Sequence, residues 1–118
     1  MRDVAIIGAG QTKFARTEWP LIDLLVEGAR TALADVKIDE SLIQALLVAN
    51  MGAGILNHQS GVASAVVDGL RMFPAHAELI ENGPASGASA VKLAFLGIAS
   101  GYYDIVMVIG GEKMRAVT

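Results

Sequence analysis

The stretch SGASAVKLAFLGIASG, residues 86–101, decides the fold more than any other part of this sequence. Its only charged side chain is Lys92, and small or apolar side chains cover nearly the whole circumference of the helix that it predicts. A surface helix keeps one polar face, whereas a helix that is apolar all round is buried all round. We therefore predict a buried central helix at 86–101. Because a single sheet covers only one of its sides, we expect polypeptide beyond these 118 residues to cover the other; the alternative is an ordinary core helix with loose patterning.

Strand and helix patterns alternate on the N-terminal side of this stretch, and one more strand pattern follows it. Four short apolar runs predict strands, and three stretches with apolar residues at helical spacing predict helices. In chain order these strands and helices cover residues 3–8, 21–36, 45–49, 58–70, 75–81, 86–100 and 104–111. The order β-α-β-α-β-α-β predicts an α/β fold with a mostly parallel sheet, right-handed crossovers and helices packed on its faces.

The composition also indicates apolar surface that needs a partner. The chain is 53% hydrophobic and 18% charged, against about 25% charged residues in a typical soluble domain. Another part of the same protein or another subunit would cover that surface. A net charge of −3 without a basic cluster argues against nucleic-acid binding. The first ten residues do not resemble a signal peptide, and no apolar run is long enough to span a bilayer. We therefore expect a soluble, cytoplasmic protein with no membrane partner.

The residues usually used in catalysis are few. The sequence contains no cysteine, which excludes disulfides, thiolate zinc sites and a cysteine nucleophile within it. His58 and His76 show no metal-ligand spacing, and ordinary surface or helix-end roles suit them better than a role as base. Ser86 and Ser89 lack an evident base and orienting group, and no Gly-x-Ser-x-Gly elbow surrounds Ser86. For Glu81, hydrogen bonding to local backbone is favoured over a catalytic role.

The sequence Gly8-Ala9-Gly10 after the first predicted strand invites comparison with a dinucleotide-binding turn. That fingerprint needs a third glycine three residues later and an acidic residue at the end of the second strand. Lys13 and Asn50 stand in those places, and a polar loop stands where the helix should begin. The pattern therefore favours a tight exit from the strand over nucleotide binding.

The turn between the third predicted strand and the 86–101 helix is the strongest candidate site. It reads Glu81-Asn82-Gly83-Pro84-Ala85-Ser86-Gly87, which we call the 81–87 turn. Proline suits the first turn of a helix, where its missing N–H has no helical partner. Free N–H groups and the positive end of the helix dipole also lie at such a turn. The position suits a nucleophile that faces an acyl group; the alternative is simply a well-capped helix start.

Four ordered segments of this chain resemble the N-terminal part of the thiolase superfamily, in the branch of archaeal acetyl-CoA acetyltransferases and sterol-carrier-protein-type thiolases. The resemblance spans the whole chain, and the set is more specific than any of its pieces. The segments are residues 4–8 with Thr12-Lys13-Phe14, Ala49-Asn50-Met51-Gly52, the 81–87 turn, and residues 99–104 running into Gly110-Gly111-Glu112-Lys113-Met114. The resemblance implies a partial thiolase-like N-terminal domain over residues 1–118, and a central helix held between two sheets.

The resemblance also places Pro84 where the family has its nucleophilic cysteine. Proline has no thiol, so no acyl-enzyme can form there. It also has no N–H, and loss of one oxyanion-hole donor costs about 10² to 10³ in rate. The family's catalytic histidine, second cysteine, Asn-Gly and Gly-His-Pro segments have no counterpart in these residues. The resemblance thus implies a fragment, a split subunit or a degenerate paralogue, with no catalytic residue assigned here.

The function that follows is that of an acetyl-CoA C-acetyltransferase-like acyl-CoA protein of lipid metabolism, truncated or catalytically degenerate. One alternative is a thiolase-like aldolase acting on CoA esters, which needs no cysteine. Another is a non-catalytic scaffold or assembly subunit, and a nicotinamide-dependent dehydrogenase is more distant. We expect no cofactor beyond a CoA ester as substrate. We also expect a homo-oligomer, dimer or tetramer, or a complementing chain; by resemblance, Ala77 and Leu79 would pair across a two-fold axis.

Overall fold

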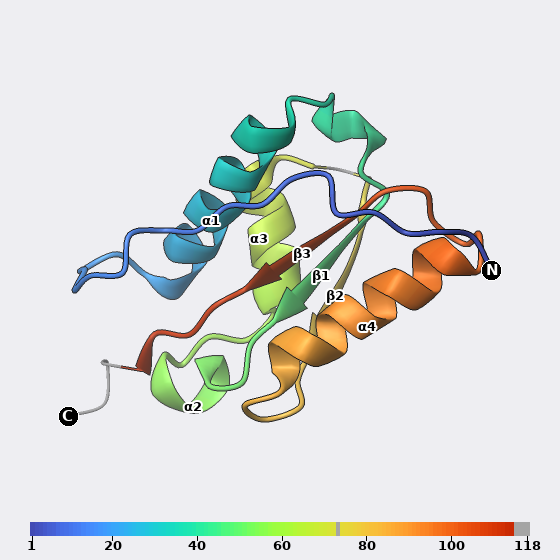
Figure 1. Cartoon of the computed structure of the whole chain (residues 1–118). Helices are drawn as coiled ribbons and strands as arrows, with labels where there is room; N and C mark the ends of the chain where they lie inside the picture. Colours follow the sequence, from blue (N-terminus) through green and yellow to red (C-terminus); the bar gives the residue numbers. More distant parts are fainter. Residues whose placement is uncertain (73, 115–118) are drawn as a thin grey trace.

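The computed structural model describes residues 1–72 and 74–114. A small parallel sheet lies between two layers of helices (Figure 1). The elements in chain order are α1 (Leu21–Val36), a 3-10 turn (Glu40–Leu42), β1 (Ala45–Ala49), α2 (Ala53–Leu56), α3 (Val62–Leu70), β2 (His76–Ile80), α4 (Ser86–Ala99) and β3 (Val106–Gly110). The predicted α/β class and parallel sheet are confirmed. Among the described residues, no helix is long and apolar enough to cross a membrane.

Strand β1 is the centre of the sheet, whose order is β2-β1-β3. Ala45 lies opposite His76 on one side and Val106 on the other, and the parallel register continues to the end of the strand. Every residue of β1 is buried, as expected for a parallel strand with helices on both faces. Its alternate side chains enter two separate clusters, one under α1 and α3 and one under α4.

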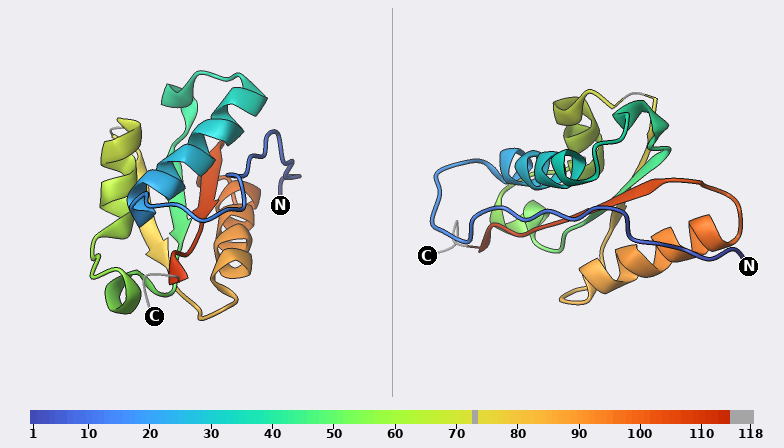
Figure 2. Two further views of the ribbon diagram at one scale, coloured as in Figure 1. Left: turned by 90° about the vertical axis from the view of Figure 1, so that its left-hand side faces the viewer. Right: turned by 45° about the horizontal axis from the view of Figure 1, so that its top comes forward.

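Helix α1 begins and ends where the pattern predicted, at Leu21 and Val36. Its buried residues recur at helical spacing and join the cluster on the α3 side of the sheet; they are Leu21, Leu25 and Ala29. The opposite side of α1 remains in contact with solvent, as an amphipathic pattern requires. Figure 2 shows α1 and α3 stacked on one face of the sheet and α4 alone on the other.

Helix α4 departs from the prediction of burial on all sides. It ends at Ala99, and only Ser86, Ala90, Ala94 and Ala99 are buried within it. On its outer side Leu93 is 41% exposed and Leu96 is 44% exposed. The three strands cover one side of the helix, and nothing among the described residues covers the other.

The first predicted strand, residues 3–8, is also absent from the sheet. The segment is extended, but Ile6 is 89% exposed and no backbone hydrogen bond joins residues 4–8 to β3 in the described part of the chain. Its two ends are bound elsewhere: Arg2 N–H donates to the Ala99 carbonyl at 2.9 Å, and Ala9 N–H donates to an Asp35 carboxylate oxygen at 2.9 Å. The sheet therefore has three strands instead of four.

The remaining differences are at element ends. Helix α3 begins at Val62 instead of residue 58, because Gly61 at its N-cap takes a left-handed conformation with φ of 60°. Residues 50–57, which lie between two predicted elements, contain the short helix α2. Strands β2 and β3 fall inside the predicted ranges 75–81 and 104–111. Since the cap and the short helix depend on local backbone conformation, apolar spacing could not have located them.

Candidate functional site

The 81–87 turn lies directly after the carboxyl end of β2 and leads into α4. Ser86 holds the turn closed from within: its hydroxyl accepts a hydrogen bond from Asn82 N–H at 2.9 Å and donates one to the Gly83 carbonyl at 2.6 Å. Ser86 is buried, and the Asn82 side-chain amide donates to the Ser89 hydroxyl at 2.9 Å. Both serine hydroxyls are therefore engaged in shaping the turn.

Glu81 folds back onto the same turn. Its carboxylate accepts a hydrogen bond from Gly83 N–H at 2.5 Å, and Gly83 takes a left-handed conformation with φ of 53°. The carboxylate thereby takes the place of a backbone partner two residues on, as the side chains of asparagine and aspartate do in turns. Of the two roles considered for Glu81, the structure supports hydrogen bonding to local backbone.

Pro84 is exposed and precedes the helix by two residues, since Ala85 is the N-cap of α4. As the N-cap residue, Ala85 makes no side-chain hydrogen bond to the helix, so the description of a well-capped helix start does not apply. Proline supplies neither an N–H nor a nucleophilic side-chain atom. At Pro84 the turn therefore offers neither a thiol nor a hydroxyl that could attack an acyl group.

Neither histidine is hydrogen-bonded to this turn among the described residues. His76 begins β2, so it stands at the end of the strand opposite the turn; its Nε2 lies 3.1 Å from Glu78, and its ring stacks on Tyr103. Burial, with smaller contributions from Tyr102 and Glu78, raises the pKa of Tyr103. His58 is exposed in the loop before α3. Among residues 1–72 and 74–114, no group of His, Cys, Asp and Glu is arranged to hold a metal ion.

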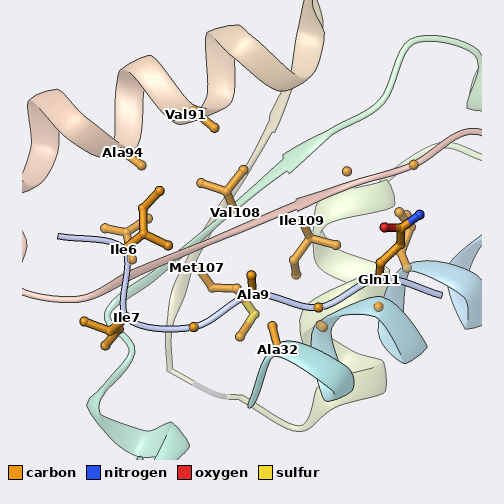
Figure 3. Close-up of a pocket in the computed structure, with 18 of the residues that line it drawn as sticks. Ile6, Ile7, Ala9, Gln11, Ala32, Val91, Ala94, Met107, Val108 and Ile109 are labelled. Carbon is orange, nitrogen blue, oxygen red and sulfur yellow. The ribbon is translucent and has the colours of Figure 1, made fainter. Parts of the chain in front are cut away.

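A cavity of about 690 Å³ lies between the N-terminal segment, α1, α4 and β3. Figure 3 shows Ile6 beside Val91 and Val108 near its α4 wall, and Ala9 beside Ala32 near its α1 wall. Its lining is mainly apolar, with a few polar groups such as Gln11. The cavity offers room for an apolar group, and it brings no nucleophile and base together.

The Gly8-Ala9-Gly10 turn lines this cavity and packs tightly on α1. A Cβ atom at Gly10 would lie 2.1 Å from the Thr31 hydroxyl, and one at Gly8 would lie 2.7 Å from Val36 Cβ. Ala9 N–H is already bound to Asp35. These glycines therefore allow the N-terminal backbone to pack closely on α1. The turn does not follow a strand and packs on a helix, so it lacks the arrangement that binds a phosphate in a dinucleotide-binding fold.

Asn50 and Glu112 form a polar junction in which Asn50 is buried and Glu112 is exposed. Asn50 follows the last residue of β1 and is 2% exposed. Its side-chain amide donates to the Gly111 carbonyl at 2.9 Å and to Glu112 at 3.1 Å. Two signals in the sequence point to the junction: an asparagine directly after a wholly apolar strand, and the presence of both residues in segments that carry the family resemblance.

Taken together, the fold defines a layered α/β domain with a parallel sheet and a polar turn at the carboxyl edge. The model of the family described as "Thiolase, N-terminal domain" matches residues 4–118. The chain therefore belongs to the thiolase family, as the resemblance had implied.

Relatives and a solved structure agree with this assignment. The chain is 41% identical to an acetyl-CoA acetyltransferase of Methanocaldococcus jannaschii, over 99% of this chain and 30% of the relative. It is 36% identical to an acetyl-CoA acetyltransferase of Methanothermobacter thermautotrophicus, over 99% of this chain and 31% of the relative. An acetyl-CoA acetyltransferase structure from Syntrophomonas wolfei shares the fold, with a TM-score of 0.73 and 22% identity over 87% of this chain and 27% of that one. The chain spans about 30% of the length of those two relatives.

Proposed function

We propose that this chain is part of a protein that binds acyl-CoA esters and that it forms no acyl-enzyme at the 81–87 turn. The substrate class is inferred from relatives described as acetyl-CoA acetyltransferases. One observation carries the second half of the proposal: the exposed Pro84 has no nucleophilic atom, and both nearby serine hydroxyls are bound to groups of the turn itself.

The chemistry of acyl transfer explains why this matters. A covalent intermediate needs a nucleophile that a base can activate, and Pro84 has no such atom. Ser86 is a poor substitute because its hydroxyl already donates to the Gly83 carbonyl, and neither histidine is its hydrogen-bond partner. We therefore assign the turn the role of a surface against which a CoA ester would lie, without a covalent step.

Two measurements test this proposal. Titration calorimetry with acetyl-CoA and with free CoA should give a heat of binding, and intact-mass spectrometry after incubation with acetyl-CoA should give no acyl adduct. The Pro84→Cys variant is the matched comparison, because its thiol would be the only one in a chain without natural cysteine. An acyl adduct on the unmodified chain would contradict the absence of an acyl-enzyme, and a lack of any binding heat would contradict the substrate class.

Carbon–carbon bond cleavage of a CoA ester, an aldolase-type reaction, is the second candidate. The absence of a nucleophile from the turn favours it, since a retro-aldol step needs proton transfer and an electron sink but no thiol. Product analysis with a β-hydroxyacyl-CoA would separate the two: release of an aldehyde or ketone supports cleavage, and recovery of the unchanged ester supports binding alone.

A scaffold or assembly role remains the alternative outside catalysis. Strand β2 is at an edge of the sheet, and its Leu79 is 46% exposed; the outer side of α4 is also apolar. We propose that a second copy or a complementing chain covers these surfaces in a cytoplasmic assembly. A measured mass above that of one chain, without binding of acyl-CoA, would favour this role.

A further inference from the structure

The carboxyl ends of all three strands meet at one residue, Asn50, whose backbone binds β2 and whose side chain binds the segment after β3. Its backbone N–H donates to the Ile80 carbonyl at the end of β2, at 3.3 Å. Its side-chain amide donates to the Gly111 carbonyl just after β3, at 2.9 Å. Its side-chain oxygen accepts from Ala53 N–H at 2.9 Å. A buried asparagine with both ends of its amide bound is held in one orientation.

Glu112 completes this junction from the β3 side. Its carboxylate accepts hydrogen bonds from Met51 N–H at 2.6 Å, from Gly52 N–H at 2.9 Å and from the Asn50 amide at 3.1 Å. Further along the same loop, the Asn57 amide donates to the Lys113 carbonyl at 3.1 Å. The loop after β1 is thus bound along much of its length to the segment after β3.

The junction is adjacent in the chain to the candidate site. Ile80, which Asn50 binds, is the last residue of β2, and Glu81 begins the 81–87 turn. We infer that Asn50, held by Glu112, is a positioning residue that sets where the 81–87 turn stands relative to the sheet. The functional meaning of this inference rests on the proposed function, because it takes the turn as the place where a CoA ester lies.

The opposite end of β1 supplies a matched control. Gln44 also joins β1 to β3, because its side-chain oxygen accepts hydrogen bonds from Asp104 N–H at 2.5 Å and Ile105 N–H at 3.4 Å. It stands at the amino end of the sheet, away from the turn. Loss of either side chain removes hydrogen bonds to the segments beside β3, but only the Asn50 side chain anchors the residue whose backbone N–H holds the Ile80 carbonyl.

The test uses a cysteine as a reporter of the turn. In a Pro84→Cys background the single thiol lies just before α4, where the helix N-terminus favours the thiolate. We would measure the rate of alkylation by iodoacetamide against pH for this background, for Asn50→Ala and for Gln44→Ala, and thermal unfolding for all three. We expect Asn50→Ala to slow alkylation at pH 7 by roughly three- to tenfold, since a displaced turn weakens the dipole effect on the thiol. Gln44→Ala should change the rate by less than about twofold.

Equal changes in both variants, or no change in Asn50→Ala, would overturn the inference. If Asn50→Ala does not fold, Glu112→Gln decides: it keeps the size of the side chain but removes one acceptor oxygen and the charge. Slower alkylation in that variant supports the inference, and an unchanged rate overturns it. The alkylation rate is measured without CoA. A failure to detect acetyl-CoA binding by calorimetry would therefore contradict the proposed function without contradicting the positioning role of Asn50.

Discussion

Helices α1 and α4 are similar in length and both rich in apolar residues, yet they present different side chains to the sheet. Helix α1 buries large side chains such as Leu21 and Leu25. Helix α4 presents Ala90 and Ala94 to the sheet, whereas its larger side chains Leu93 and Leu96 are exposed. One sheet is enough to bury the apolar side of the amphipathic helix α1, whereas α4 has a second apolar side that nothing among the described residues covers.

The largest expected effect is on the α1 side. Leu25→Ala removes a side chain that is 2% exposed, and truncation of a buried leucine costs about 2 to 5 kcal/mol of unfolding free energy. The same change in α4, Leu93→Ala, should cost clearly less because Leu93 is partly exposed. Urea unfolding followed by circular dichroism measures both. Equal losses of unfolding free energy would show that the two leucines contribute equally to stability, contrary to the difference in their burial.

A test of the α4 contact enlarges a small side chain. Ala90 is fully buried against β1 and β3, so Ala90→Leu should destabilise the chain by about 1 to 3 kcal/mol through overpacking. Ala88→Leu, on the exposed side of the same helix, is the control and should be tolerated. The same denaturant titration applies; comparable stability of both variants would mean that α4 does not pack closely on the sheet.

The ends of the two helices give a smaller contrast. Gly101, after α4, has φ of 85°, and Lys37, after α1, has φ of 55°. Gly101→Ala places a Cβ atom in a left-handed conformation and should lower the unfolding free energy by about 1 to 2 kcal/mol. Lys37→Ala should change little, since a side chain already occupies that conformation. A neutral Gly101→Ala, measured by thermal unfolding, would indicate that the backbone turns differently there.

The smallest expected effect concerns the outer side of α4. Leu96 is 44% exposed, and Leu96→Gln should change the unfolding free energy by less than about 0.5 kcal/mol, as is usual for surface positions. Sedimentation should at the same time show less self-association, because apolar surface has been removed. Marked destabilisation would mean that Leu96 is already covered in solution, by a second copy or by other polypeptide.

Much of the fold was predictable because local pattern and burial agree. The bounds of α1 and β1 match the predicted ranges 21–36 and 45–49, since their apolar spacing corresponds to faces that are buried in the structure. The strand predicted at residues 3–8 is wrong for the described chain. An apolar run shows that a segment can be a strand, but not whether a neighbouring edge will bind it; here Arg2 and Ala9 hold the segment elsewhere.

The candidate site was predictable in place but not in detail. The residues of the 81–87 turn stand out because a proline and glycines separate an apolar strand from a helix. Its internal bonds, in which the Ser86 hydroxyl binds Asn82 and Gly83, depend on side-chain geometry. The Asn50–Glu112 contact joins residues 62 positions apart, and no local pattern in one sequence indicates which distant polar groups will meet.

By itself, the amino-acid sequence determined the alternation of strands and helices, the absence of a thiol and the apolar character of α4, because these follow from residue type and spacing. Only the tertiary structure decided which side of α4 is covered, whether residues 4–8 enter the sheet, and which polar side chains join the strand ends. Those outcomes depend on contacts between segments far apart in the chain, where geometry and competing partners select among arrangements that local preference leaves open.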